Sequence, residues 1–405
     1  MRRHNKPNSV WQEEELKENI FSAKTISVIK RIFREYYFKK SNAIEEPSKI
    51  EHREFGYMQF GQAGMVRHLS FKSMKELDAM LVREAPSDVY CSNAYYQFPT
   101  QQPMQEKQWL GADLIFDIDG KDIDLPCVPL HSYPLCMNCG YVLPSTLDEG
   151  KSYSCPSCGY KKADYVSLPC SKCIEGSKKE VRQLIEFLMV DLGIEQSNIH
   201  VYFSGNNGFH IHVNDDAYVP LDPQARSDLV SYLSGIGFMS ESIGVRKSNT
   251  EDLFFIKFPR SGLAYGWRRR IADKLKIDTS STIKLRYIVK QKGGYIAFKL
   301  ELDRMAKQMG VRLDPQVTTD VHRVFRIPGT LNSKSGLAKA RCGDIYSFDP
   351  FVDACLLGDG KVSVRLKAPI KLKLMGKSFN ISKESAEMPA YAAVYLMCKG
   401  LAEAH

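Results

Sequence analysis

The chain has 405 residues, of which 43% are hydrophobic and 25% charged, and it carries a net charge of +9 at pH 7. These values are ordinary for a soluble globular protein with a substantial core. No stretch resembles a signal peptide or a membrane span, which excludes the secreted and membrane-embedded classes, so we expect the protein to stay in the compartment where it is made, with no membrane partner. The positive charge suits a partner with a phosphate backbone, although many basic proteins bind no nucleic acid.

The first predicted elements are a helix, a set of strands and a second helix. Ile29, Ile32 and Tyr36 recur at helical spacing near the N-terminus. Residues 52–71 alternate apolar and polar side chains, as strands do. The segment 73–88 then predicts a short helix, which ends at Pro86 because proline cannot continue a helix.

Residues 111–119 read GADLIFDID, an apolar strand that ends in two aspartates. Residues two apart on a strand face the same side, so Asp117 and Asp119 project together. Adjacent carboxylates repel each other unless a hard cation such as Mg2+ or Mn2+ binds them. A two-metal site for phosphoryl transfer needs such a pair and a further carboxylate. The motif is common, however, and a strand end followed by a turn explains it equally well.

Seven of the eleven cysteines fall between positions 127 and 173. Two matching CxxCGY knuckles offer four sulfurs to a tetrahedral Zn2+ ion, and three further cysteines with a histidine make a second candidate site around them. The alternative for the outer set is an ordinary surface histidine beside spare cysteines. Both sets are complete without water, which indicates structural zinc. The inner set is Cys136, Cys139, Cys155 and Cys158, and the outer set is Cys127, His131, Cys170 and Cys173.

An amphipathic helix is predicted directly after Cys173, and the segment HVYFSGNNGFHIHV then predicts strand, turn and strand. The Ser204 hydroxyl and the free amides of this turn form the kind of nest that binds anions. Of His210 and His212, we expect only one to face the turn and reach a phosphate. A plain β-hairpin explains the same segment equally well.

The next part of the chain, from residue 217 to about 310, is mixed, basic and helix-leaning, and its residues 257–292 form either a nucleic-acid surface or a solvated face. Asp314 and Asp320 follow, and then Arg323 and Arg326. A third metal-binding carboxylate followed by cations for a triphosphate has this pattern, and so does a solvated strand edge. Further strands lead to a C-terminal helix from Pro389. Strands and helices mixed without regular βαβ alternation predict an α+β (mixed α/β) fold.

The order of these motifs is more informative than each motif alone. FDID, a zinc-binding insertion, SGxxGxH, LDxxVTxD and RxPGxLxxKxG follow one another, and HREFGY precedes them. In this order the chain resembles the archaeo-eukaryotic primase family, and specifically its small catalytic subunit. The resemblance runs from about Arg53 to Gly336 and covers most of the chain.

The resemblance implies a set of residue roles. Asp117, Asp119 and Asp314 correspond to the three catalytic carboxylates, which bind two Mg2+ or Mn2+ ions, and Asp314 fits better than Asp320. Ser204, His210 and Arg326 correspond to contacts of the nucleotide triphosphate. The chain departs from the family near the phosphates, because Asn206 and Asn207 stand in the turn where the family often has arginine, and Asn332 stands before Lys334 where it often has a histidine. These departures imply that the phosphate contacts are weaker or come from Lys257, Arg260 or Arg323.

The resemblance also implies an organisation and partners. The catalytic core would comprise residues 1–126, 174–216 and 310–405, with a zinc-binding insertion at 127–173 and a basic helical insertion at 217–309. The outer Cys3His set would be the family's zinc knuckle, and the inner ribbon an addition. Expected partners are a large subunit that carries an iron–sulfur domain, a single-stranded DNA template with its primer, and nucleoside triphosphates. The expected setting is the replication fork in an archaeal cytoplasm.

Two other functional classes remain open at this point. A related primase-polymerase of repair or of a mobile element would share the three aspartates but would often lack the zinc knuckle. A non-enzymatic zinc-ribbon protein would bind nucleic acid without any need for the carboxylates. The primase interpretation predicts template-directed synthesis of short RNA, or DNA, primers by metal-assisted nucleotidyl transfer.

Overall fold

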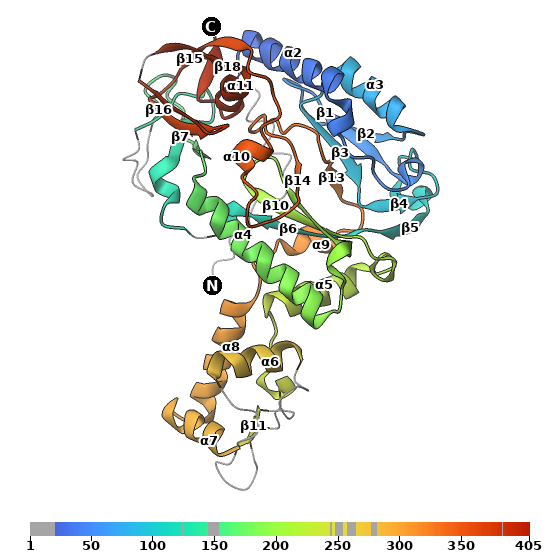
Figure 1. Cartoon of the computed structure of the whole chain (residues 1–405), viewed down its shortest axis with the longest axis vertical. Helices are drawn as coiled ribbons and strands as arrows, with labels where there is room; N and C mark the ends of the chain where they lie inside the picture. The colour runs from blue at the N-terminus through green and yellow to red at the C-terminus, as the bar shows by residue number, and fades with distance from the viewer. Residues whose placement is uncertain are drawn as a thin grey trace.

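The computed structural model describes residues 21–123, 125–144, 154–243, 245–247, 254–256, 265–276, 282–382 and 384–405. These residues form a mixed α/β fold, as the sequence predicts. Two four-stranded antiparallel sheets lie at its centre, with strand orders β13-β3-β1-β2 and β14-β9-β10-β6 (Figure 1). In the described part of the chain, no helix combines the length and apolar character needed to cross a bilayer.

The first sheet combines three strands from the N-terminal quarter of the chain with one strand from a much later segment. Its strands are β1 (Phe55–Met58), β2 (Met65–Leu69), β3 (Asp88–Ser92) and β13 (Val324–Arg326). Helices α2 (Ala23–Lys39) and α3 (Met74–Glu84) pack against each other beside it (Figure 1). Ser22 caps α2 by accepting a hydrogen bond from the amide of Thr25, and α3 ends at Ala85, directly before Pro86.

The second sheet holds the acidic strand. Its strands are β6 (Leu114–Asp119), β9 (Ile199–Phe203), β10 (Gly208–Val213) and β14 (Ala340–Cys342). The predicted strand, turn and strand around Ser204 are β9 and β10, which form a hairpin. Strand β10 also pairs with β6, so His210 lies opposite Asp117 and Gly208 opposite Asp119. Helix α4 (Ser171–Glu186), continued by a π-helical turn (Phe187–Asp191), and the short helix α9 (Pro315–Thr319) contact this sheet.

The helical region lies at one end of the molecule. It comprises α5 (Pro223–Ser234), α6 (Gly266–Leu275), α7 (Thr282–Gln291), α8 (Tyr295–Met309) and the strands β11 (Val245–Lys247) and β12 (Phe254–Ile256). Helices α6, α7 and α8 extend away from the two sheets, whereas α5 lies next to them (Figure 1). Arg226 of α5 is fully buried and donates hydrogen bonds to the carbonyls of Ala112 and Asp113, just before β6. These bonds attach α5 to the second sheet, and the domain boundary that we predicted at residue 217 stays a prediction.

The remaining elements surround these sheets. They are β4 (Ala94–Tyr96), β5 (Trp109–Ala112), β7 (Ser132–Cys136), β8 (Ala163–Ser167), α10 (Pro350–Asp353), β15 (Lys361–Leu366), β16 (Ile370–Leu374), β17 (Lys377–Ile381), β18 (Ser385–Pro389), α11 (Ala390–Cys398) and β19 (Ala402–Ala404). Every residue of α11 is buried, which is typical of a helix enclosed by its own protein. The predicted C-terminal helix is thus part of the core, where it packs on α2 and β15.

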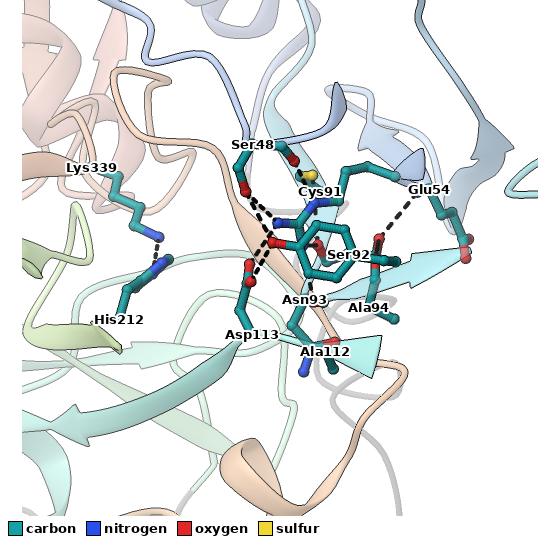
Figure 2. Close-up of polar contacts among 12 residues, drawn as sticks. Ser48, Glu54, Cys91, Ser92, Asn93, Ala94, Ala112, Asp113, His212 and Lys339 are labelled. Carbon is teal, nitrogen blue, oxygen red and sulfur yellow. Dashed lines mark hydrogen bonds and ion pairs between the residues drawn. The ribbon is translucent and has the colours of Figure 1, made fainter. Parts of the chain in front are cut away.

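A buried arginine connects the two sheets. Arg53, just before β1, donates hydrogen bonds to the carbonyls of Ser92 and Asn93 at 2.9 Å and forms an ion pair of 2.7 Å with Asp113, just before β6. The ring of Tyr95 lies 3.7 Å from the guanidinium, and its hydroxyl donates to Asp113 at 2.6 Å. Figure 2 shows the two dashed lines that meet at the carboxylate of Asp113, one for its ion pair and one for its hydrogen bond. The approach to β6 is therefore fixed to the first sheet.

Candidate active site

Three of the predicted carboxylates are brought to one place. Asp117 and Asp119 lie on the same, partly exposed face of β6. Asp314 comes from the segment before α9, and its backbone amide donates a hydrogen bond of 3.2 Å to the carbonyl of Asp117. Asp320 lies one helix further on, where its carbonyl accepts a hydrogen bond from Asn93. Their roles in catalysis stay predictions, because placement alone tests no role.

The electrostatics of this group are unfavourable for three bare carboxylates. Burial, with the neighbouring charges of Asp119 and Asp314, raises the pKa of Asp117 to about 7. Lys121 offsets part of this charge through an ion pair of 3.1 Å with Asp119. Three carboxylates that repel one another and offer only oxygen ligands are the donor set that Mg2+ and Mn2+ prefer. The residues present therefore fit a divalent cation.

The two predicted phosphate-binding turns pack against each other. The Ser204 hydroxyl accepts from the amide of Gly208 at 3.2 Å, which closes the hairpin turn. Asn332, from the second turn, donates to the Ser204 carbonyl at 3.4 Å and accepts from the amide of Lys334 at 2.8 Å. The Oδ1 atom of Asn207 is buried and has no hydrogen-bond partner among the described residues. Residues more than a hundred positions apart in the sequence thus form one continuous surface.

His210 and His212 lie on β10, the strand next to the one that carries Asp117 and Asp119, and His210 is opposite Asp117. The Nε2 atom of His210 is 3.5 Å from Asp117 Oδ1, and burial lowers the pKa of both histidines well below its usual range. Both rings contact Phe325, at 5.7 and 6.3 Å between centroids. Our expectation that only one of the two faces inward was wrong, because residues two apart on a strand share a face.

The two predicted arginines differ in their surroundings. Arg326 is buried, with an ion pair of 2.6 Å to Asp88 and a hydrogen bond of 2.8 Å to the carbonyl of Leu331. Although burial opposes ionisation of the Asp88 carboxyl, the charge of Arg326 keeps its pKa below the usual range. Arg323 is partly exposed, and its positive charge offsets part of the rise in the pKa of Asp117. Lys257 and Arg260, the other cations considered, lie outside the described residues.

A cleft of about 560 Å³ opens beside the carboxylates. Its walls come from the β1–β2 turn, the ends of β3 and β6, both phosphate-binding turns, the β7–β8 hairpin and the residues after α11. The predicted residues that line it are Asp119, Asn206, Asn207 and Lys334. Lys121 and Lys399 also line the cleft, and neither was predicted from the sequence. The sequence feature that could have pointed to Lys399 is its position as a single charged residue directly after the apolar run AYAAVYLMC.

The cysteines form the two clusters that the sequence predicts. In each cluster, the four ligand atoms lie within 4.8 Å of one another. Sulfur–sulfur distances run from 3.6 Å for Cys127–Cys173 to 3.9 Å for Cys170–Cys173, close to the roughly 3.8 Å of a tetrahedral zinc site and far from the roughly 2.05 Å of a disulfide. Each cluster therefore fits one Zn2+ ion.

Local backbone and neighbouring side chains prepare both clusters. In the inner cluster, Gly140 and Gly159 have φ of +66° and +74°, and their amides donate to the carbonyls of Cys136 and Cys155 in two matching turns. In the outer cluster, Ser167 contacts His131 Nδ1 at 3.1 Å, which leaves Nε2 directed at Cys173 Sγ, 3.3 Å away. A hydrogen bond of this kind orients a metal-ligating imidazole.

Comparisons with known proteins agree with this geometry. The family model described as DNA primase small subunit matches residues 163–342. A protein named DNA primase small subunit PriS from Nitrosopumilus maritimus (strain SCM1) is 41% identical over 380 residues, which cover 93% of this chain and 98% of that protein. The chain belongs to the DNA primase small-subunit family. Relatives of the same name from Cenarchaeum symbiosum (strain A) and Archaeoglobus fulgidus are 39% and 29% identical and match 94% and 92% of this chain, and 99% and 96% of their own lengths.

Membership of the family confirms the resemblance drawn from the ordered motifs. The family model begins within the cysteine-rich stretch and ends at the end of β14, so it spans both turns, Asp314 and Arg326. The match with the relatives extends over nearly the whole chain, including the residues that flank this central part.

Proposed function

We propose that the protein is the catalytic small subunit of a DNA primase, which joins nucleoside triphosphates into short primers on a single-stranded DNA template. The observation that carries the proposal is the meeting of Asp117, Asp119 and Asp314 at the edge of a cleft lined by lysines and amides. A metal-binding carboxylate group beside a cationic cleft is what nucleotidyl transfer requires.

Asp117, Asp119 and Asp314 would hold the divalent cations. When bound, these ions would activate the attacking 3′-hydroxyl and offset the charge of the pyrophosphate leaving group. The chain itself positions the carboxylates through β6, through the Asp314 amide and through the pairing of His210 with Asp117. The Ser204 turn and the Asn332–Lys334 turn present amides and side chains to the phosphates, with Asn206, Asn207, Arg323 and Arg326 around them.

The zinc clusters would be structural. The outer cluster joins the start of α4 to the segment before β7, and the inner cluster holds the hairpin that forms one wall of the cleft. The relatives are proteins of archaea, which supports an archaeal cytoplasm and its replication forks as the setting. A large primase subunit, which the resemblance implies, would complete the enzyme.

The proposal is tested by primer synthesis without a pre-existing primer. Purified protein, alone and with its large subunit, is supplied with single-stranded DNA, nucleoside triphosphates and Mg2+ or Mn2+. We expect products with the unaltered chain and with Asp359→Asn, an exposed control outside the cleft, and none with the double variant Asp117→Asn/Asp119→Asn. Synthesis by the double variant would refute the proposal, and DNA binding without any synthesis would favour the non-enzymatic class.

A further inference from the structure

The residue that follows α11 reaches the phosphate-binding turn from the opposite end of the chain. Lys399 is only 8% exposed, and its Nζ atom donates a hydrogen bond of 2.8 Å to the Oδ1 atom of Asn206. Asn206 is one of the two asparagines that stand where the family often has arginine. The cationic side chain of Lys399 therefore lies beside a position where the family often has a cationic arginine and this chain has the neutral Asn206.

The backbone fixes this lysine in place. Helix α11 ends in a Schellman motif, in which Gly400 donates to the carbonyl of Met397 at 2.8 Å and Leu401 donates to that of Leu396 at 3.0 Å. Gly400 has a φ of +72°, a conformation that glycine adopts without strain. Because the helix is wholly buried, the motif holds Lys399 at one defined site on the cleft wall.

The amide of Asn206 has a defined orientation in this arrangement. An ammonium group only donates hydrogen bonds, so Asn206 presents its oxygen to Lys399 and keeps two N–H donors on the other side of the amide. One ammonium and one amide group thus supply several donors at a single point of the turn. An arginine offers a comparable set of donors to a phosphate.

The cleft has the charge pattern of a site for a metal-bound polyphosphate. Asp119 lies at one side, with Lys121 next to it, and Lys334 and Lys399 lie on the turns and on the helix end that complete the wall. Two further carboxylates line the cleft, Asp88, which is paired with Arg326, and Asp164. A carboxylate that can hold a cation, together with three lysines, matches a triphosphate with its bound metal ion. The volume of about 560 Å³ is that of a small-molecule site.

We propose that Lys399 and Asn206 together bind the triphosphate of the incoming nucleotide, with Lys399 in place of the arginine of the turn. The inference rests on the proposed function and assigns a phosphate contact to a segment outside the motifs. A purely structural role, in which Lys399 only ties α11 to the hairpin, makes different predictions about which ligands are affected.

The experiment measures equilibrium binding of ATP and AMP, with Mg2+ and without template, to five forms of the full chain: the unaltered protein, three variants at the proposed site and one control. Lys399→Gln should weaken ATP binding by about tenfold to a hundredfold, the value of a charge-assisted hydrogen bond, and change AMP binding by less than about twofold. Lys399→Arg should retain ATP binding. The double variant Lys399→Gln/Asn206→Arg should recover most of it, because the cation returns to the turn.

Lys178→Gln is the matched control. Lys178 is 6% exposed and donates to a neutral oxygen, the carbonyl of Tyr346, but it does not line the cleft, so its loss should leave ATP binding unchanged. Equal ATP binding by Lys399→Gln and the unaltered chain would overturn the inference alone. So would an equal loss of ATP and AMP binding that Asn206→Arg does not repair. An unaltered chain that binds no nucleoside triphosphate would overturn the proposed function as well.

Discussion

Arg53 and Asp113 form an ion pair of 2.7 Å that joins the segment before β1 to the segment before β6. The Arg53 side chain is 3% exposed and that of Asp113 is 20% exposed, so water screens the pair only weakly. Asp113 lies four residues before Asp117, so a shift of the strand at this point would move the carboxylates of Asp117 and Asp119 with it. We therefore predict that the pair positions these carboxylates, although neither Arg53 nor Asp113 lines the cleft.

The first prediction concerns this pair. Asp113→Asn leaves the buried Arg53 without its counter-charge, so we expect a loss of roughly 2–4 kcal/mol in the free energy of unfolding. We also expect kcat for primer synthesis to fall at least about tenfold with little change in KM for the nucleotide, because the carboxylates move and the phosphate turns do not. Chemical denaturation and steady-state kinetics measure the two effects.

Asp191→Asn provides the comparison for Asp113→Asn. The side chain of Asp191, in the π-helical turn after α4, is 2% exposed and pairs with Arg270 of α6 at 3.1 Å. This variant should lose similar stability and keep kcat. If both variants lowered kcat equally, the effect would be a general consequence of instability, and the positioning role of Arg53 and Asp113 would be wrong.

The second prediction separates Asp314 from Asp320. Both side chains accept a backbone hydrogen bond, from Gln316 and His322 respectively, and asparagine preserves such a bond. Asp314→Asn should lower kcat by at least about a hundredfold, because it removes a carboxylate next to Asp117. Asp320→Asn should remain within about threefold of the unaltered chain in the same synthesis assay. The reverse ranking of the two variants would assign the role of the third metal-binding carboxylate to Asp320.

The third prediction concerns metal content. Elemental analysis of the purified chain should find two zinc ions, one for each cluster. Cys127→Ser and Cys158→Ser should each leave one ion and lower the unfolding temperature, because structural zinc contributes its binding free energy to folding. Cys355→Ser, a buried cysteine outside both clusters, should retain two ions. Two zinc ions in Cys127→Ser would show that the outer cluster is not a zinc site.

The fourth prediction is a pH dependence of stability. Lys339 is fully buried, its Nζ lies 3.1 Å from His212 Nε2, as Figure 2 shows, and burial together with the charge of Arg326 lowers its pKa to about 7. In the unfolded chain the lysine keeps its proton up to about pH 10.5. The unfolded state therefore binds more protons between these values, and stability rises with pH in this window.

From pH 7 to 8.5 this lysine should add at most about 2 kcal/mol to the free energy of unfolding. Chemical denaturation of the unaltered chain and of Lys339→Met at the two pH values measures the difference in slope. Equal slopes would show that Lys339 titrates normally in the folded protein. The other groups that act on or contact this lysine are Glu45, Cys91, Asp117 and Tyr202.

The local patterns of the sequence predict much of the fold. The spacing of Ile29, Ile32 and Tyr36 predicts α2, and Pro86 marks the end of α3. The strand before Asp117 and the hairpin around Ser204 follow from short-range periodicity and turn residues. The cysteine spacings predict both clusters, because a CxxC turn defines most of the ligand geometry within four residues.

The parts of the site that depend on distant contacts were beyond the reach of such patterns. The guanidinium of Arg326 pairs with Asp88, and a pairing across more than two hundred residues leaves no local signal; the contact of Arg326 with a triphosphate stays a prediction. The hydrogen bond from Lys399 to Asn206 likewise joins residues that are far apart in the sequence, so no local pattern predicts it. Arg53 and Asp113 were not singled out, since a charged residue before a strand usually lies in solvent.

The wide sequence separation of the cleft walls has a consequence for biosynthesis. Strand β3 completes its sheet only with β13, β9 pairs with β14, and the cleft also needs the residue after α11. Contacts of such high sequence separation form late, because the closure entropy of long loops must be overcome first. Nearly all of the 405 residues must therefore leave the ribosome before a nascent chain can form the cleft, and shorter nascent chains expose unpaired sheet edges that are prone to aggregation.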